Sequence, residues 1–291
     1  MEKIQSAIAK ARASRAGQVS PADTAPPAPP ATSVSGSVLA TVASAPAGQG
    51  AGSWIGAAWD ALPGFVPNAA LMTRNRIVSY EGGREAVAFD VMRTKLIQQM
   101  RANNWRRLAI TSPGAGCGKS TIALNLGFSL ARQADLRTIV AEMDLRRPSL
   151  AKTLGIRAGH SFAKVLDGSE PFEDHVLRYG HNLALATNQG AIRNPAELLH
   201  SPGVITALAD IEARYEPSVM IFDMPPMLVS DDAMAFMGQV DCVLLVAAAE
   251  ATTIKEIDVC ERDLAAQTNV LGVVLNKCRY MGQDYGYDGY Y

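Results

Sequence analysis

The stretch Ile110–Thr121, ITSPGAGCGKST, decides the fold of this chain. It lies between a short apolar run and a segment with helical spacing, which is the strand-to-helix setting of a phosphate-binding loop. Glycines let backbone N–H groups turn toward phosphate oxygens, the helix N-terminus adds positive potential, and Lys119 adds a mobile cation. A tight turn alone would have no use for Lys119. We expect ATP to contact Gly114, Ala115, Gly116, Cys117, Gly118, Lys119, Ser120 and Thr121, with the Ser120 hydroxyl also available to Mg2+.

The loop departs from the usual GxxxxGK[ST] pattern at its first position. Pro113 stands where the first glycine is expected, and proline offers no N–H. Partition ATPases of the Par and Min type carry a second, signature lysine inside the loop, and the corresponding residue here is Gly114. Their mechanism is therefore disfavoured.

Strand and helix signals alternate on both sides of the loop. An apolar helical stripe runs from Glu85 to Asn103, and further helical stretches cover Ile122–Ala131 and Ile254–Ala265. Apolar strand candidates are Leu108–Ile110, Thr138–Ala141, Leu183–Ala186, Val219–Phe222, Cys242–Val246 and Val270–Leu275. This alternation predicts an α/β fold of the P-loop NTPase kind, with a doubly wound, mostly parallel sheet, helices on both faces, and ligands at the carboxyl ends of the strands.

Acidic residues follow two of these strands. The segment Thr138–Leu150, TIVAEMDLRRPSL, places Glu142 and Asp144 two residues apart, so strand alternation points both at one site. Such a pair could hold the water shell of Mg2+ or accept a proton from an attacking hydroxyl. Asp223, in IFDMPP, takes the position of a Walker B aspartate.

Composition excludes some functions and compartments. The 27 basic and 28 acidic residues leave a net charge of -1, so no overall field recruits nucleic acid or an anionic membrane. The four cysteines have no metal-binding spacing and suit reduced thiols. The longest apolar stretch, around 241–251, is too short to span a bilayer. We expect a cytoplasmic protein.

The chain divides into five parts by composition. Residues 1–15 have the spacing of an amphipathic docking helix, with a frayed terminus as the alternative, and residues 16–53 form an Ala/Pro/Ser-rich linker that we expect to be disordered. Residues 54–83 bring two tryptophans and a phenylalanine that pack on the domain or on a partner. The P-loop domain covers residues 84–278, and residues 279–291 form a tail.

The tail is rich in tyrosine. Five of the eight tyrosines lie in the last twelve residues, among glycines that keep the backbone loose: Tyr280, Tyr285, Tyr287, Tyr290 and Tyr291. Phosphates on them would each add a charge of up to about -2 and make the tail self-repelling, which suits a release switch. Asn276 follows the last strand, at the place where related P-loop proteins recognise the base, and is a candidate contact to it. A guanine-reading NKxD motif would need an acid where the chain has Arg279, which favours adenine.

These motifs together resemble the cytoplasmic kinase domain of the bacterial tyrosine kinases that control capsule and exopolysaccharide synthesis. The resemblance runs from about Val87 to the C-terminus and rests on TSPGAGCGKST, EMDLRRP, IFDMPP and the terminal tyrosines. It implies that Lys119 binds the ATP phosphates, that Ser120, Asp144 and Asp223 organise Mg2+, and that Asp144 or Glu142 activates the tyrosine. The candidate catalytic residues are Lys119, Glu142, Asp144, Arg146 and Asp223.

Two departures from this family bear on activity. The family usually has aspartate at the position of Glu142, so the longer side chain puts the geometry of the metal shell in question. The family's helix before the loop commonly carries Glu, Arg and Arg at three-residue spacing for ring assembly, whereas this chain has Val87, Asp90 and Arg93.

The leading hypothesis is a Mg-ATP-dependent autokinase that phosphorylates its tail in trans. It would bind ATP and ADP, self-associate, avoid nucleic acid, and be held at the inner face of the membrane by a separate adaptor of the polysaccharide machinery. The alternatives are an ATP-binding switch or scaffold without kinase activity and, less favoured, a partition-type ATPase.

Overall fold

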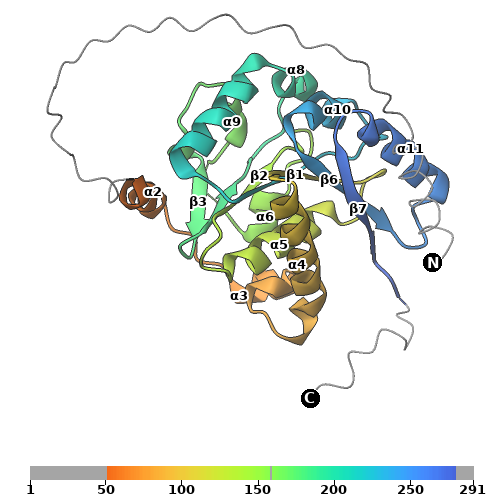
Figure 1. The fold of residues 1–291 in the computed structure, drawn as a ribbon, viewed down its shortest axis with the longest axis horizontal. Helices are drawn as coiled ribbons and strands as arrows, with labels where there is room; N and C mark the ends of the chain where they lie inside the picture. Colours follow the sequence, from red (N-terminus) through yellow and green to blue (C-terminus); the bar gives the residue numbers. More distant parts are fainter. Residues whose placement is uncertain (1–50, 158, 280–291) are drawn as a thin grey trace, which may run out of the picture. The chain divides into compact units, whose positions relative to one another are not determined.

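The computed structural model describes residues 51–157 and 159–279, which are built on a seven-stranded sheet (Figure 1). The strand order is β3-β4-β2-β5-β1-β6-β7, and all neighbours run parallel except β3 and β4. The strands are β1 (Arg107–Thr111), β2 (Thr138–Glu142), β3 (Val176–Tyr179), β4 (Leu183–Ala186), β5 (Val219–Asp223), β6 (Cys242–Ala248) and β7 (Asn269–Asn276). The predicted mostly parallel α/β fold is confirmed.

The strand that the sequence analysis missed is β3. It is four residues long, it carries Arg178 among apolar neighbours, and it lies at the edge of the sheet. A run this short gives no readable alternation, because a period of two needs several repeats to stand out.

Helices cover both faces of the sheet, as predicted (Figure 1). The first layer contains α3 (Ala69–Arg74), α4 (Val87–Ala102), α5 (Lys119–Ala131) and α6 (Leu150–Leu154). The second contains α2 (Ala51–Asp60), α7 (Phe162–Leu166), α8 (Pro195–Leu199), α9 (Pro202–Tyr215), α10 (Asp232–Phe236) and α11 (Ile254–Ala265). Strand β1 serves both layers because its side chains alternate: Leu108 and Ile110 lie in the first core and Ala109 in the second.

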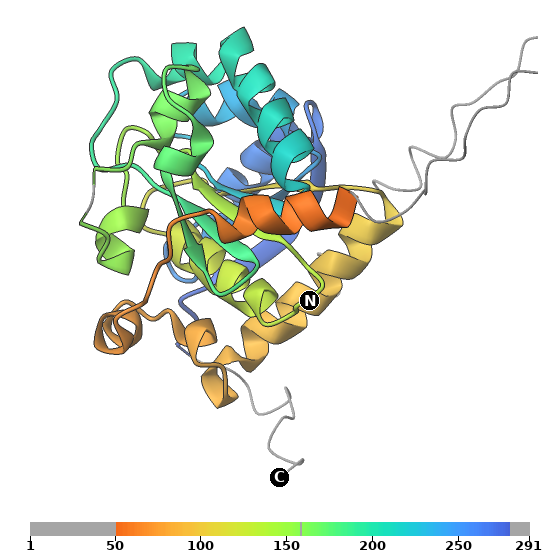
Figure 2. The same cartoon turned by 90° about the vertical axis from the view of Figure 1, so that its left-hand side faces the viewer.

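Of the two tryptophans in the segment before the domain, Trp59 packs on the domain itself, whereas Trp54 is 47% exposed. Trp59 of α2 is buried, its indole N–H donates to the Tyr215 carbonyl at 2.7 Å, and its ring meets that of Tyr215 edge-on, so α2 lies against α9 (Figure 2). Helix α2 begins at Ala51 and so includes three residues assigned above to the linker. Beyond it, Phe65 N donates to the Arg178 carbonyl, and the chain covers the outer edge of β3.

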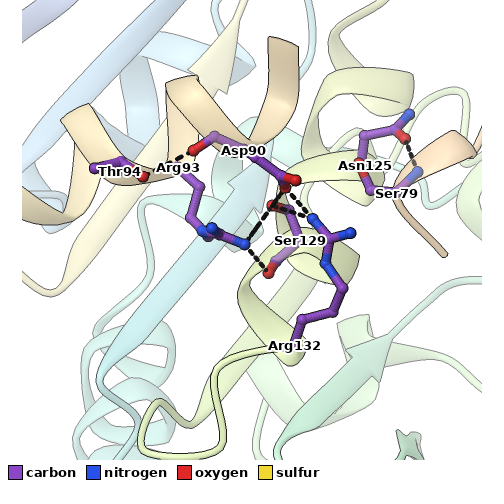
Figure 3. Close-up of polar contacts among 7 residues, drawn as sticks. All are labelled: Ser79, Asp90, Arg93, Thr94, Asn125, Ser129 and Arg132. Carbon is purple, nitrogen blue, oxygen red and sulfur yellow. Dashed lines mark hydrogen bonds and ion pairs between the residues drawn. The ribbon is translucent and has the colours of Figure 1, made fainter. Parts of the chain in front are cut away.

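Polar contacts join α4 to α5 (Figure 3). The Ser129 hydroxyl donates to Asp90 at 2.6 Å, Arg93 donates to the Ser129 carbonyl at 2.9 Å, and Arg132 pairs with Asp90. Asp90 and Arg93, two of the three positions compared with the ring-forming helix, therefore bind a neighbouring helix of their own chain.

Part of the chain lies outside the described residues. This includes the predicted docking helix at 1–15, nearly all of the 16–53 linker, and all five tail tyrosines. Within 51–157 and 159–279, no helix combines the length and the apolar character needed to cross a membrane.

Candidate nucleotide-binding site

The phosphate loop connects β1 to α5 at the carboxyl edge of the sheet. Gly116 and Gly118 have φ values of 77° and 96°, a left-handed conformation that favours glycine. A Cβ on Gly118 would also lie 2.2 Å from the Asn276 amide nitrogen. Ala115 and Gly116 are exposed at the tip, so the tip is open to a ligand.

The entrance to the loop is held by the segment that follows β5. Met227 N donates to the Ser112 carbonyl at 2.8 Å and Leu228 N to the Pro113 carbonyl at 3.0 Å. The Thr111 hydroxyl donates to the Pro225 carbonyl at 2.7 Å. Pro113 therefore takes part in these hydrogen bonds through its carbonyl, and none of them requires an N–H at this position.

Lys119 and Asp144 meet beside the loop. The lysine Nζ lies 3.0 Å from Asp144 Oδ2, and the other oxygen accepts the backbone N–H of Arg147 at 3.1 Å. Both side chains are nearly enclosed, at 12% and 8% exposure. The structure thus brings together the two residues that the sequence analysis assigned to ATP phosphates and to the metal.

Asp223 is the most unusual group of the site. It is fully buried, and neither carboxylate oxygen has a hydrogen-bond partner among the described residues. Burial raises its pKa to about 6, while the Lys119 charge acts to lower it, as does the Ser120 hydroxyl, which comes near the carboxylate without meeting hydrogen-bond geometry; the Asp144 charge adds to the rise. An unpartnered buried carboxylate is costly unless a ligand completes it.

This donor set fits Mg2+. The described residues contain no group of three His, Cys, Asp or Glu that could cage a metal. Mg2+ does not need such a cage, since it is commonly held by one or two carboxylates together with waters and substrate phosphates. Asp223, Asp144 and the Ser120 hydroxyl supply oxygens of that kind.

Glu142 is also buried, but its oxygens are occupied. One accepts N–H groups of Ser149 and Leu150, the latter at 2.7 Å, and the other accepts Asn188 N at 2.8 Å. Burial raises the Glu142 pKa to about 7, although these backbone donors act to lower it. Glu142 ties the start of α6 and the loop after β4 to the end of β2.

Glu142 and Asp144 therefore face different partners, contrary to the strand-alternation argument. Regular pairing of β2 stops at Glu142, because the backbone N–H groups of Met143 and Asp144 both donate to the carbonyl of Asp223, at 2.9 and 3.0 Å. The chain turns there, so a period of two no longer predicts where Asp144 points.

Two further candidates have protein partners. Arg146 forms a two-point ion pair with Asp232, whose side chain is buried. The Asn276 side-chain amide donates to the Cys117 carbonyl at 2.8 Å, so it stabilises the phosphate loop. The sequence analysis named neither Asp232 nor Asn188. Two adjacent aspartates, Asp231 and Asp232, follow the IFDMPP motif closely and could have indicated Asp232. Nothing in the sequence near Asn188 indicated its contact with Glu142.

Two surface hollows, of about 360 and 580 Å3, lie elsewhere. Both include Arg106, at the opposite end of β1, and neither includes a residue of the phosphate loop. The nucleotide site is identified by its donors, not by the depth of a cavity.

A glycine loop on a helix N-terminus, an enclosed lysine and strand-end carboxylates define a P-loop NTPase site. A family model described as ParA, NUBPL iron-transfer P-loop NTPase, matches residues 104–288, more than half of the chain. The chain belongs to this family of P-loop NTPases.

Several curated proteins similar to this chain are named as bacterial tyrosine kinases, which agrees with the motif resemblance. The chain is 27% identical over 199 residues to the putative tyrosine-protein kinase AmsA of Erwinia amylovora, covering 67% of this chain and 27% of AmsA. It is 29% identical to the tyrosine-protein kinase YwqD of Bacillus subtilis, covering 63% of this chain and 78% of YwqD. The chain spans about a quarter of the length of the first curated relatives it matches.

Solved structures show the same likeness. The kinase domain of the Escherichia coli tyrosine kinase ETK superposes with a TM-score of 0.61 and 26% identity, covering 70% of this chain and 80% of that one. The VpsO kinase domain gives a TM-score of 0.59 and 28% identity, covering 67% of this chain and 96% of that one.

Proposed function

We propose that this chain is a Mg-ATP-dependent protein-tyrosine autokinase that phosphorylates its own C-terminal tyrosines in trans. The observation that carries the proposal is the meeting of Lys119 and Asp144 beside the unpartnered Asp223 on a phosphate loop. The kinase names of its relatives and the five terminal tyrosines support the reaction type. We further propose a role in capsule or exopolysaccharide synthesis, at the inner membrane face through a separate adaptor.

The reaction moves one phosphoryl group. The bond between the γ-phosphorus and the β,γ-bridging oxygen of ATP breaks, a bond from phosphorus to the tyrosine oxygen forms, and ADP leaves. Bound Mg2+ would neutralise charge on the phosphates. Lys119 and the loop N–H groups would hold the phosphates, while Asp144 and Asp223 would hold Mg2+ through its waters. The hydroxyl proton passes to a carboxylate, for which we assign Asp144, because it lies beside Lys119 of the phosphate loop, whereas Glu142 is turned toward backbone donors of α6 and of the loop after β4.

A binding-only switch or scaffold is the second candidate. Glu142 favours this candidate. The related kinases usually carry aspartate at this position, and in this chain the Glu142 carboxylate is occupied by backbone N–H donors. Such a protein would bind Mg-ATP without labelling its tail.

Mass spectrometry of tail peptides after incubation with Mg-ATP separates the two. The autokinase predicts phosphate on tyrosines among residues 280–291 and loss of the signal in Lys119→Met. The matched control is Lys95→Met, at an exposed position of α4. Because we propose that the kinase acts together with a membrane adaptor, the assay includes the cytoplasmic part of that adaptor. An unlabelled wild-type tail under these conditions, with ATP bound, would establish the scaffold instead.

A further inference from the structure

The ion pair between Arg146 and Asp232 joins two acidic segments of the site. Arg146 Nε and Nη2 donate to the two oxygens of Asp232, the second at 3.0 Å, and the Ser230 hydroxyl donates to the same carboxylate at 2.9 Å. The Asp232 side chain is 1% exposed and that of Arg146 is 49% exposed. The carboxylate is thus a fixed, enclosed anchor, and the guanidinium is open on its other side.

Both partners are tied to the phosphate loop through their neighbours. Arg146 follows two residues after Asp144, which bonds the loop lysine. Asp232 opens α10 at the end of the segment that begins with Asp223, and this segment is bonded to the loop entrance through Leu228 N and the Pro113 carbonyl. The position of the guanidinium therefore depends on both carboxylate-bearing segments.

The pair leaves donors unused. A guanidinium has five N–H groups in a fixed fork, and two-point pairing with Asp232 uses one on Nε and one on Nη2. The remaining three suit phosphate oxygens, which arginine binds in the same planar, two-point manner. The hydrogen bonds and the charge of Asp232 raise the Arg146 pKa, and the nearby carboxylates of Asp231 and Glu197 add to this effect.

We propose that Asp232 is a positioning residue that holds Arg146 so that its free N–H groups bind the terminal phosphate of ATP. The inference rests on the proposed function for ATP as the ligand and adds the residue that sets the arginine in place. It predicts that the pair distinguishes ATP from ADP, since ADP lacks the group that Arg146 would bind.

The test compares the affinities of a non-hydrolysable ATP analogue and of ADP, both with Mg2+. In Asp232→Asn and in Arg146→Lys we expect the analogue to bind on the order of tenfold more weakly, the loss of one hydrogen bond to a charged group, with ADP affinity unchanged. The double variant should be no weaker than Arg146→Lys alone, because both changes remove the same contact.

The matched control is Glu212→Gln. Glu212 forms a two-point pair with Arg107, at 2.7 Å for both bonds, at the other end of β1. Its loss should lower the melting temperature without changing the ratio of the two affinities. If Asp232→Asn does not fold, the affinity ratio of Arg146→Lys is the test, because lysine keeps the positive charge but lacks the planar, two-point N–H donors of the guanidinium.

An unchanged affinity ratio in the folded variants, or additive losses in the double variant, would overturn the proposal. An unphosphorylated tail in the wild type overturns the kinase activity only, because both affinities are measured without turnover.

Discussion

Glu142 and Asp223 are neighbours across the sheet, yet they have opposite surroundings. They end β2 and β5, they are paired in register, and both side chains are fully buried. Glu142 accepts three backbone N–H groups, whereas Asp223 has no hydrogen-bond partner among the described residues. Burial raises the pKa of each, to about 7 and about 6.

The difference separates framework from site. A buried carboxylate with its lone pairs filled by backbone donors stabilises the loops that supply those donors. One left without donors costs folding free energy, and it is retained where a ligand completes it. Burial and an altered pKa alone would have assigned both residues to catalysis, and only the list of partners distinguishes them.

The largest expected effect is the loss of stability on changing Glu142 to glutamine. A glutamine oxygen can accept some of these N–H groups, but its NH2 group would face the remaining donors. We expect unfolding free energy to fall by about 3 kcal/mol, the cost of leaving buried donors unpaired. Urea denaturation checks this. Glu256→Gln is the control, because Glu256 accepts N–H and O–H bonds in an exposed capping box and should lose less than about 1 kcal/mol. Equal losses in the two variants would show that the bonds from backbone N–H groups to Glu142 do not stabilise the fold in particular.

Asp223→Asn should have the reverse effect on the metal-free protein. The folded-state pKa is about 6, above the ordinary 3.8, so ionisation opposes folding and this cost appears as pH rises through about 6. With EDTA present, the variant should be more stable than the wild type by between about 2 and 3 kcal/mol at pH 8 and nearly equal to it at pH 4. A variant less stable at pH 8 would mean that Asp223 has partners in the free protein.

The smallest effect is expected from Ser149→Ala. Its hydroxyl lies 3.4 Å from the Ser120 hydroxyl, while its backbone N–H donates to Glu142. The substitution removes only the hydroxyl contact, so stability should change by less than about 1 kcal/mol. A loss as large as that of Glu142→Gln, measured by the same denaturation, would mean that the Ser149 hydroxyl, and not its backbone N–H, stabilises this part of the fold.

Sequence reasoning succeeded where local pattern and topology agree. The loop Ile110–Thr121, the parallel strands and both helical layers follow from periodicity and from the strand-loop-helix setting. Lys119 and Asp144 were brought together correctly, because carboxyl ends of parallel strands share one edge.

It failed where contacts are long-range or where regular pairing stops. The hydrogen bonds to Glu142 include one from Asn188, which is distant in sequence, and the anchor of Arg146 is Asp232, on another segment. The turn after Glu142 is made by N–H bonds to the Asp223 carbonyl, which strand periodicity cannot foresee. The tryptophan segment stayed ambiguous because an apolar cluster looks the same whether it packs on its own domain or on a partner.

The most direct test of this account is the Mg2+ dependence of ATP affinity in the wild type, Asp223→Asn and Glu142→Gln. We expect Mg2+ to strengthen ATP binding in the wild type and in folded Glu142→Gln, and to have at most a small effect in Asp223→Asn, a difference on the order of tenfold or more. Full Mg2+ dependence in Asp223→Asn, or its loss in Glu142→Gln, would contradict the assignment of Asp223 to the metal and Glu142 to the framework.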